Sequence, residues 1–150
     1  MSAPKTLYLS AEEMRGIAAV PGLCLGWFVV LQCPDEARRG ALMKLTAPIS
    51  VLSRGLPSVT ANEEWFGFND DFVSSGHALV HRPLGSDRSD SFTIRDRETP
   101  GPSANGTFVN SRKLGQGEIA QLSEGDIVRL GTTELIFKSL WLPPGGATKV

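Results

Sequence analysis

Short runs of β-branched and aromatic residues, each bounded by Gly, Pro, Asn, Asp or Ser, fill most of the chain from residue 26 onward. This pattern predicts strands at 26–32, 41–46, 48–53, 65–68, 77–82, 91–96, 107–109, 112–114, 117–121, 126–130 and 134–141. Short strands at this close spacing, with no helical periodicity between them, indicate an all-β fold. We therefore expect an eleven-strand antiparallel β-sandwich.

The two ends of the chain show different patterns. Residues 1–24 form an N-terminal extension, in which Ser10 and Glu13 fit a capping box at the start of a short helix that Pro21 ends. Residues 25–141 form the β-sandwich domain. Residues 142–150 have the Pro and Gly content of a flexible tail or linker.

Composition narrows the classes of partner. Fifteen basic and sixteen acidic residues give a net charge of -1, so the chain lacks the basic field of a protein that coats nucleic acid. The longest apolar run, 25–31, is far shorter than the roughly 20 residues that span a bilayer. With only Cys24 and Cys33, and no charged-then-apolar leader at the start, we expect free thiols and a cytoplasmic protein without membrane contact.

Four short motifs carry the functional signal: "SRG" at 53–55, "VSSGHA" at 73–78, "SANGTFVN" at 103–110 and "LSEGDIVRLGTTELIF" at 122–137. In this order, and each at a predicted strand end, they resemble the forkhead-associated (FHA) domain family. The resemblance covers about residues 25–141. It implies the SMAD/FHA type of β-sandwich and the binding of phosphothreonine peptides by loops at one end of it.

The resemblance assigns phosphate binding to Arg54, Ser74 and Ser75. A phosphothreonine carries about −1.5 to −2 charges and three acceptor oxygens, so its reader needs a fixed cation with further donors beside it. The planar guanidinium of Arg54 matches a phosphate better than a lysine would. Ser75 stands where the family often places Arg, Lys or Asn, and it donates without a charge.

Five further residues have roles by the same resemblance. Asn105 pairs with the backbone of the bound peptide, since a side-chain amide is donor and acceptor together. Asn110 is either a second peptide contact or a residue that holds a turn. His77 supports the site from within and does not bind the phosphate, Gly106 supplies a positive φ in the Asn-Gly turn, and Thr107 packs beneath the loop.

The sequence departs from the family pattern near the site. Ser53 replaces the glycine that precedes the arginine, Ala104 replaces a frequent threonine, and Ser75 carries no charge. The segment between Arg54 and Ser74 is long and contains Glu63 and Glu64, whose charges we expect to repel a phosphopeptide unless salt screens them.

Catalytic and metal-binding readings fit the residues poorly. Ser74 and His77 have no identifiable acid as the third member of a hydrolase triad, and "GPSAN" at 101–105 has Asn105 in place of the second glycine of a nucleophile elbow. His77 and His81, four apart on a predicted strand, lie about 13 Å apart, too far to share one ion. We predict no enzyme activity, no metal and no cofactor.

The function indicated is that of an adaptor in serine/threonine kinase signalling, whose partner is a phosphothreonine-containing kinase or kinase substrate. Nucleic acid is not an expected partner. The alternative is a phosphate-independent scaffold or self-association domain, with Trp27, Trp65 and Trp141 available for apolar contact. Thr60 and Thr148 are candidate sites of phosphorylation for binding by a second copy or by the same domain.

Overall fold

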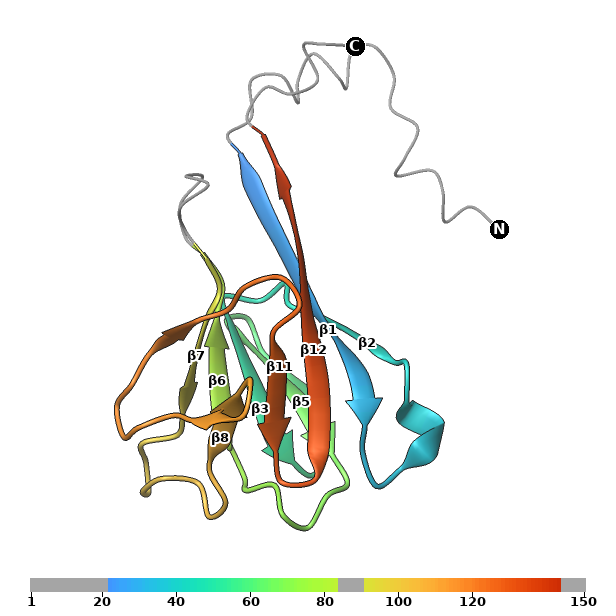
Figure 1. The fold of residues 1–150 in the computed structure, drawn as a ribbon, viewed down its shortest axis with the longest axis vertical. Coiled ribbons are helices and arrows are strands. Elements are labelled where there is room, and N and C mark those ends of the chain that lie inside the picture. Colours follow the sequence, from blue (N-terminus) through green and yellow to red (C-terminus); the bar gives the residue numbers. More distant parts are fainter. Residues whose placement is uncertain (1–21, 84–90, 144–150) are drawn as a thin grey trace.

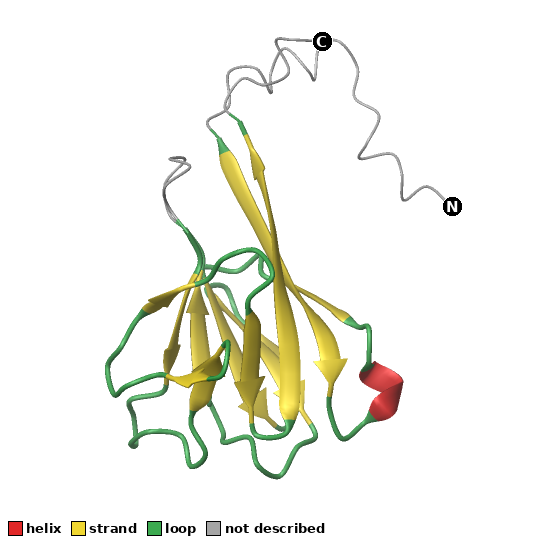
Figure 2. Ribbon diagram, in the orientation of Figure 1, coloured by secondary structure: helices red, strands yellow, loops and turns green. Residues whose placement is uncertain are grey.

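The computed structural model describes residues 22–83 and 91–143, which form two packed β-sheets (Figures 1 and 2). Their helical content is one short 3₁₀ helix, Glu36–Arg38. The strands are β1 (Leu23–Gln32), β2 (Leu42–Lys44), β3 (Ile49–Arg54), β4 (Ser58–Val59), β5 (Glu63–Phe68), β6 (Ala78–His81), β7 (Thr93–Asp96), β8 (Thr107–Val109), β9 (Arg112–Lys113), β10 (Ala120–Gln121), β11 (Ile127–Leu130) and β12 (Thr133–Leu142).

The order of strands is β2-β1-β12-β11-β8-β9 in one sheet and β10-β7-β6-β3-β5-β4 in the other. The predicted all-β sandwich is confirmed, with two corrections. The described residues form twelve strands, because Ser58–Val59 pairs with β5 inside a segment that we read as a loop. The fold is also not purely antiparallel, since β3 and β5 run parallel, with Ile49 opposite Glu63 and Arg54 opposite Phe68.

The core lies between the two sheets and follows from the alternation along the strands. In β1 the side chains of Phe28 and Val30 are buried, and in β12 those of Leu135 and Phe137 are buried. The Phe137 ring meets Phe28 edge-on at 5.7 Å between centroids. This is a favourable geometry for two aromatic rings and aligns the two longest strands.

The long strands β1 and β12 continue past the rest of the sandwich as a two-stranded arm (Figure 1). Leu23–Gly26 pairs there with Ser139–Leu142. The exposed side chains of the arm include Leu23, Leu140 and Leu142. The loops that carry the predicted site lie at the opposite end of the molecule, below β3, β6 and β7 in Figure 1.

Some predictions fall outside the described residues. The expected helix at the N-terminus, Thr148 and the part of the predicted tail from residue 144 onward are among them. Leu142, the first residue of the predicted tail, belongs to β12. In the described part, no helix is long and apolar enough to cross a membrane.

Candidate functional site

Two loops meet the end of β3 at one end of the sandwich. Residues 69–77 join β5 to β6, and the backbone amide of Arg54 donates to the carbonyl of Ser74 at 3.1 Å. The 97–106 segment joins β7 to β8 and contacts the first loop through Ala104, whose amide donates to the Ser74 hydroxyl at 3.0 Å. Residues far apart in sequence therefore reach one place because three strands end there.

A hollow of about 260 Å³ opens between these segments. Four of the predicted residues lie on its wall: Arg54, Ser74, Ser75 and Asn105. The other residues that line it are Asp71, Phe72, Val73, Arg97 and Ala104. The hollow thus combines two guanidinium groups with serine hydroxyls and a side-chain amide, and one carboxylate, that of Asp71, lies on the same wall.

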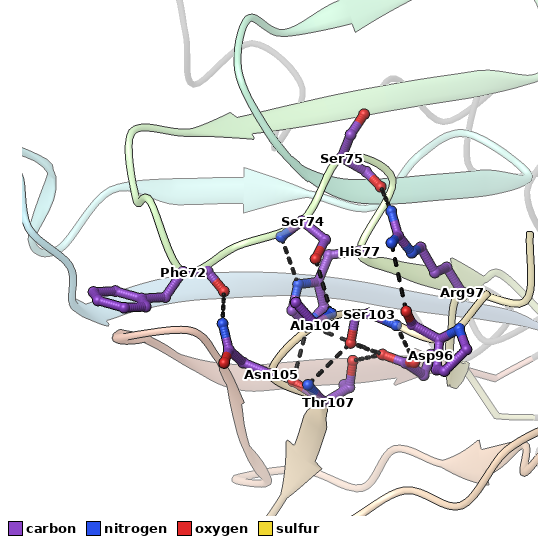
Figure 3. A network of polar contacts seen from close by, with 12 residues as sticks. Phe72, Ser74, Ser75, His77, Asp96, Arg97, Ser103, Ala104, Asn105 and Thr107 are labelled. Carbon is purple, nitrogen blue, oxygen red and sulfur yellow. Dashed lines mark hydrogen bonds and ion pairs between the residues drawn. The ribbon is translucent and has the colours of Figure 1, made fainter. Parts of the chain in front are cut away.

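Ser74 is placed so that its hydroxyl faces the neighbouring loop (Figure 3). The hydroxyl oxygen accepts from the Ala104 amide, and the Ser74 amide donates to Nδ1 of His77 at 2.9 Å. An oxygen that accepts this bond keeps its own hydrogen for donation. Ser74 can therefore donate to an anion in the hollow while its backbone stays fixed.

His77 is fully buried behind the loops and joins them (Figure 3). Because Nδ1 accepts from the Ser74 amide, the ring hydrogen is on Nε2, which donates to the carbonyl of Gly106 at 2.9 Å. Burial lowers the pKa of His77 below its ordinary value, against the Gly106 hydrogen bond and the nearby Asp96 carboxylate, which both raise it. The neutral ring holds Ser74 to Gly106 and has no place on the wall of the hollow.

A buried polar cluster holds the Asn-Gly turn from below. The carboxylate of Asp96, at the end of β7, accepts from the amide and the hydroxyl of Ser103 at 2.9 and 2.5 Å and from the Thr107 hydroxyl at 2.7 Å. The Ser103 hydroxyl in turn accepts from the Gly106 amide, and Gly106 has a φ of +82°. The sequence interpretation placed Gly106 and Thr107 here but missed Asp96 and Ser103.

Asn105 lies exposed at the rim, and one N–H of its side-chain amide donates to the Phe72 carbonyl at 2.9 Å. This bond links the two loops again and orients the amide. The remaining N–H and the Oδ1 atom are available for the backbone of a bound peptide, which offers one acceptor and one donor for each residue.

Asn110 is not brought to the hollow. Its side chain donates to Asp126 at 2.9 Å and accepts from the Ile127 amide at 2.8 Å, and its φ is +50°. Of the two roles left open by the sequence, the structure shows the residue that holds a turn: Asn110 ties the β8–β9 turn to the start of β11. Its assignment to peptide binding is therefore not supported by its position.

Ser53 explains one departure from the family pattern. Its side chain is buried; the hydroxyl accepts from the Gly76 amide at 2.9 Å and donates to the carbonyl of Arg54, also at 2.9 Å. Ser53 thus adds a side-chain link between the end of β3 that carries Arg54 and the loop that carries Ser74. It does not hold the two segments apart.

Asp70 anchors the start of the same loop to the β11–β12 turn. Its carboxylate accepts from the Phe72 amide and from the hydroxyls of Thr132 and Thr133. Burial alone would raise the pKa of Asp70, but these hydrogen bonds outweigh it and hold the pKa below its ordinary value. The carboxylate therefore stays charged and keeps the loop in place.

The acidic residues that we expected to repel a phosphopeptide lie elsewhere. Glu63 and Glu64 begin β5, opposite Ile49 and Ser50, whereas Arg54 is opposite Phe68. Four to five residues along a strand correspond to about 13–16 Å. Since this distance exceeds the Debye length of about 8 Å at physiological salt, we expect salt to screen the charges of these two residues at Arg54.

Arg97 is a second cation that the sequence interpretation missed. Its guanidinium donates to the carbonyls of Ser75 at 2.8 Å, Gly101 at 3.0 Å and Pro102 at 3.4 Å (Figure 3). Ser75 lies 22 residues earlier in the chain. No local pattern around Arg97 indicates this contact, because it depends on how β6 and β7 pair.

The described residues contain no group of three or more His, Cys, Asp or Glu side chains that could hold a metal ion. A β-sandwich with a polar hollow between strand-end loops is the class of protein that this geometry defines.

Comparisons with known proteins agree with that class. Residues 62–131 match the FHA domain family model. The chain is similar to an FHA domain studied for its phosphothreonine-dependent interactions, at 24% identity over 76% of this chain and 95% of that chain, with a TM-score of 0.54. It is also similar to the FHA domain of CT664 from Chlamydia trachomatis, at 23% identity over 76% and 96% of the two chains, with a TM-score of 0.56.

Full-length yeast Pml1p is a further structural relative, at 19% identity over 91% of this chain and 90% of that chain, with a TM-score of 0.60. The comparison with curated proteins finds no match. The resemblance to the FHA family is confirmed: residues 62–131 match the FHA domain model, and the two sheets share the fold of solved FHA domains. The matched range includes Ser74, His77 and Asn105 and begins after Arg54.

Proposed function

We propose that this protein is a phosphothreonine-peptide-binding module. The observation that carries the proposal is the position of Arg54, exposed at the end of β3 on the wall of the hollow that also contains the Ser74 hydroxyl. A fixed guanidinium beside a hydroxyl donor suits a group with two negative charges and three acceptor oxygens.

Each part of a phosphopeptide has a partner in this arrangement. Arg54 and Ser74 take the phosphate, with the Ser75 hydroxyl beside them. The free donor and acceptor of Asn105 take the peptide backbone next to the phosphothreonine. The loops are already held by His77, Asp70 and Ser53, so little ordering is required on binding, which favours affinity.

In the cell we place this module in the cytoplasm as an adaptor without catalytic activity, in serine/threonine kinase signalling. Its partner is a kinase or a kinase substrate with an accessible phosphothreonine. The phosphothreonine-dependent interactions of a structural relative support this reading at the level of the family.

Calorimetric titration tests the proposal. A degenerate phosphothreonine peptide pool is titrated into the protein, beside the same pool without phosphate. Saturable heat is expected with the phosphorylated pool alone, and Arg54→Ala should abolish it. Arg39→Ala is the matched control, because Arg39 is also exposed but bonds to the Leu31 carbonyl, away from the hollow.

A second candidate function has its own observation. The arm of β1 and β12 exposes Leu23, Leu140 and Leu142 at the end opposite the hollow. Exposed apolar groups of this kind suit a protein contact that needs no phosphate, such as scaffolding or self-association. Binding of a partner that ignores both the phosphate and Arg54→Ala would favour this function over the first.

A further inference from the structure

Arg97 and the nearby Arg95 of β7 differ in the hydrogen-bond partners of their guanidinium groups. Arg95 is in β7 and Arg97 directly follows the strand, where its amide continues the pairing by donating to the His77 carbonyl at 3.0 Å. Because the two residues are two apart along extended backbone, their side chains point to the same face. Arg95 donates to the Glu98 carboxylate at 2.8 Å, which neutralises it. The three hydrogen bonds shown for Arg97 all go to neutral carbonyls, those of Ser75, Gly101 and Pro102.

The carboxylates near Arg97 do not replace an ion partner. Asp96 is the last residue of β7, but its oxygens accept from Ser103 and Thr107. Asp71 lies on the wall of the hollow and forms no ion pair with Arg97 in the structure. Arg97 is therefore a fixed, half-buried cation, and within residues 22–83 and 91–143 no bonded anion balances its charge.

Arg97 shares the wall of the hollow with Arg54 and the two serines. A guanidinium has five N–H groups, and the three carbonyls use three of them. Its bond to the Ser75 carbonyl also ties it to the residue that stands where the FHA family often has a charged or amide donor. A side chain that directly follows β7 thus brings to this position the charge that Ser75 lacks.

We propose that Arg97 is a second phosphate-binding cation of this site, held in place by the three carbonyls and acting together with Arg54. The proposal rests on the phosphothreonine-binding function proposed above. The ligand it implies is a dianionic phosphate in preference to a single carboxylate, because two cations facing one small hollow favour two negative charges.

Four variants test this role with a phosphothreonine peptide selected from the pool. Arg97→Gln keeps hydrogen-bond donors but removes the charge, and Arg97→Lys keeps the charge but not the planar fork. Arg95→Gln is the matched control, two residues earlier and on the same face, and Arg54→Ala tests the underlying function. Thermal unfolding of each variant shows whether it remains folded.

We expect Arg97→Gln to weaken binding about tenfold, the size of one charge-assisted hydrogen bond at the low end of its range. Its affinity should also depend less steeply on salt than that of the wild type, since one charge has left the site. Arg97→Lys should lose less affinity and keep the steeper salt dependence, and Arg95→Gln should match the wild type in both.

The variants distinguish failure of the phosphothreonine-binding function from failure of the role proposed for Arg97. If Arg54→Ala leaves binding intact, the phosphothreonine function itself is wrong. If Arg54→Ala abolishes binding while Arg97→Gln keeps the affinity and the salt dependence of the wild type, only the role of Arg97 is wrong. Equal losses for Arg97→Gln and Arg97→Lys, with an unchanged salt dependence, would make Arg97 a structural link and overturn its action on the phosphate.

Discussion

Nδ1 of His77 lies 2.9 Å from the backbone nitrogen of Ser74, and the other ring nitrogen lies 2.9 Å from the carbonyl oxygen of Gly106. One buried ring thus sets the distance between the serine loop and the Asn-Gly turn. This is why a histidine directly follows two serines and a glycine in the sequence. The ring fixes Ser74, which lines the hollow, and the turn that carries Asn105, without itself lining the hollow.

Removal of this ring should damage both stability and binding. His77→Ala leaves a cavity and two backbone groups without partners, so we expect the free energy of unfolding to fall by about 3 kcal/mol or more. Phosphopeptide binding should weaken as well, because Ser74 and Asn105 lose their common support. Urea unfolding and calorimetry measure the two effects.

The second histidine of the chain is the control for this experiment. His81 is the last residue of β6, the strand that His77 directly precedes, but it is only half-buried. His81→Ala should change the free energy of unfolding by less than about 1 kcal/mol and leave binding unchanged. Similar effects for the two alanine variants would contradict the role given to His77.

Low pH should weaken the link that the His77 ring forms between Ser74 and Gly106, and so lower the free energy of unfolding. Burial lowers the pKa of His77 in the folded state, so between that pKa and the unfolded value of about 6.5 the unfolded chain binds more protons than the folded one. Stability should therefore fall as pH drops below about 6.5, by up to about 1.4 kcal/mol per pH unit. Protonation of Nδ1 also removes the acceptor for the Ser74 amide.

The acid effect can be assigned to one ring. The pKa of His81 is also lowered, by burial and then by Arg95, so the measurement is made in His81→Gln, where His77 is the only histidine left. Asp70 acts in a separate window: its folded pKa is lowered below 3.8, so its contribution is lost as pH falls below that value. A flat stability profile from pH 6.5 to 5 in His81→Gln would refute this account.

We expect two buried serines of β3 to differ in how replacement by alanine changes the free energy of unfolding. The Ser53 hydroxyl links Gly76 to the carbonyl of Arg54, so Ser53→Ala should lower the free energy of unfolding by about 1–2 kcal/mol. Ser50 is equally buried, but its hydroxyl has no hydrogen-bond partner. Ser50→Ala should therefore be neutral or stabilising.

Binding separates the two serines further. Ser53→Ala should weaken the phosphopeptide complex, because the end of β3 that carries Arg54 is no longer tied to the serine loop. Ser50→Ala should bind as the wild type does. Both changes delete one oxygen from the same strand, so a loss of stability in Ser50→Ala equal to that in Ser53→Ala would show that the hydroxyl bonds of Ser53 contribute nothing.

The sequence allowed the fold class and most of the hollow to be predicted because both depend on local signals. Period-two alternation and turn residues mark the strands, and the motifs around Arg54, Ser74 and Asn105 each sit at a strand end. These three residues meet because β3, β6 and β8 have ends on one side of the sandwich.

What the sequence did not reveal depends on long-range pairing. The two residues of β4 form a strand only because β5 lies beside them, and the parallel pairing of β3 with β5 leaves no trace in local alternation. Arg97 donates to the carbonyl of Ser75, 22 residues earlier in the chain. The Asp96 carboxylate accepts from Ser103 and Thr107, which lie in a later loop and strand. Contacts of this kind can be recognised only after the pairing and register of the strands are known.

The buried carboxylate of Asp96 gives the last prediction. Its Oδ1 accepts from two hydroxyls, and its Oδ2 accepts from the Ser103 amide. In Asp96→Asn one of these oxygens becomes an NH₂ group, which cannot accept, so at least one buried donor loses its partner. We expect the free energy of unfolding to fall by about 2–3 kcal/mol, the range for a buried hydrogen bond to a charged group.

Asp71→Asn is the control, because this exposed carboxylate lies on the wall of the hollow. It should leave stability nearly unchanged and strengthen phosphopeptide binding modestly, since one negative charge near the phosphate is removed. Asp96→Asn should weaken binding, because the turn that presents Asn105 loses its support. If Asp96→Asn retained full stability and affinity, the turn would be held by the His77–Gly106 bond alone, and the cluster beneath it would have no part in the site.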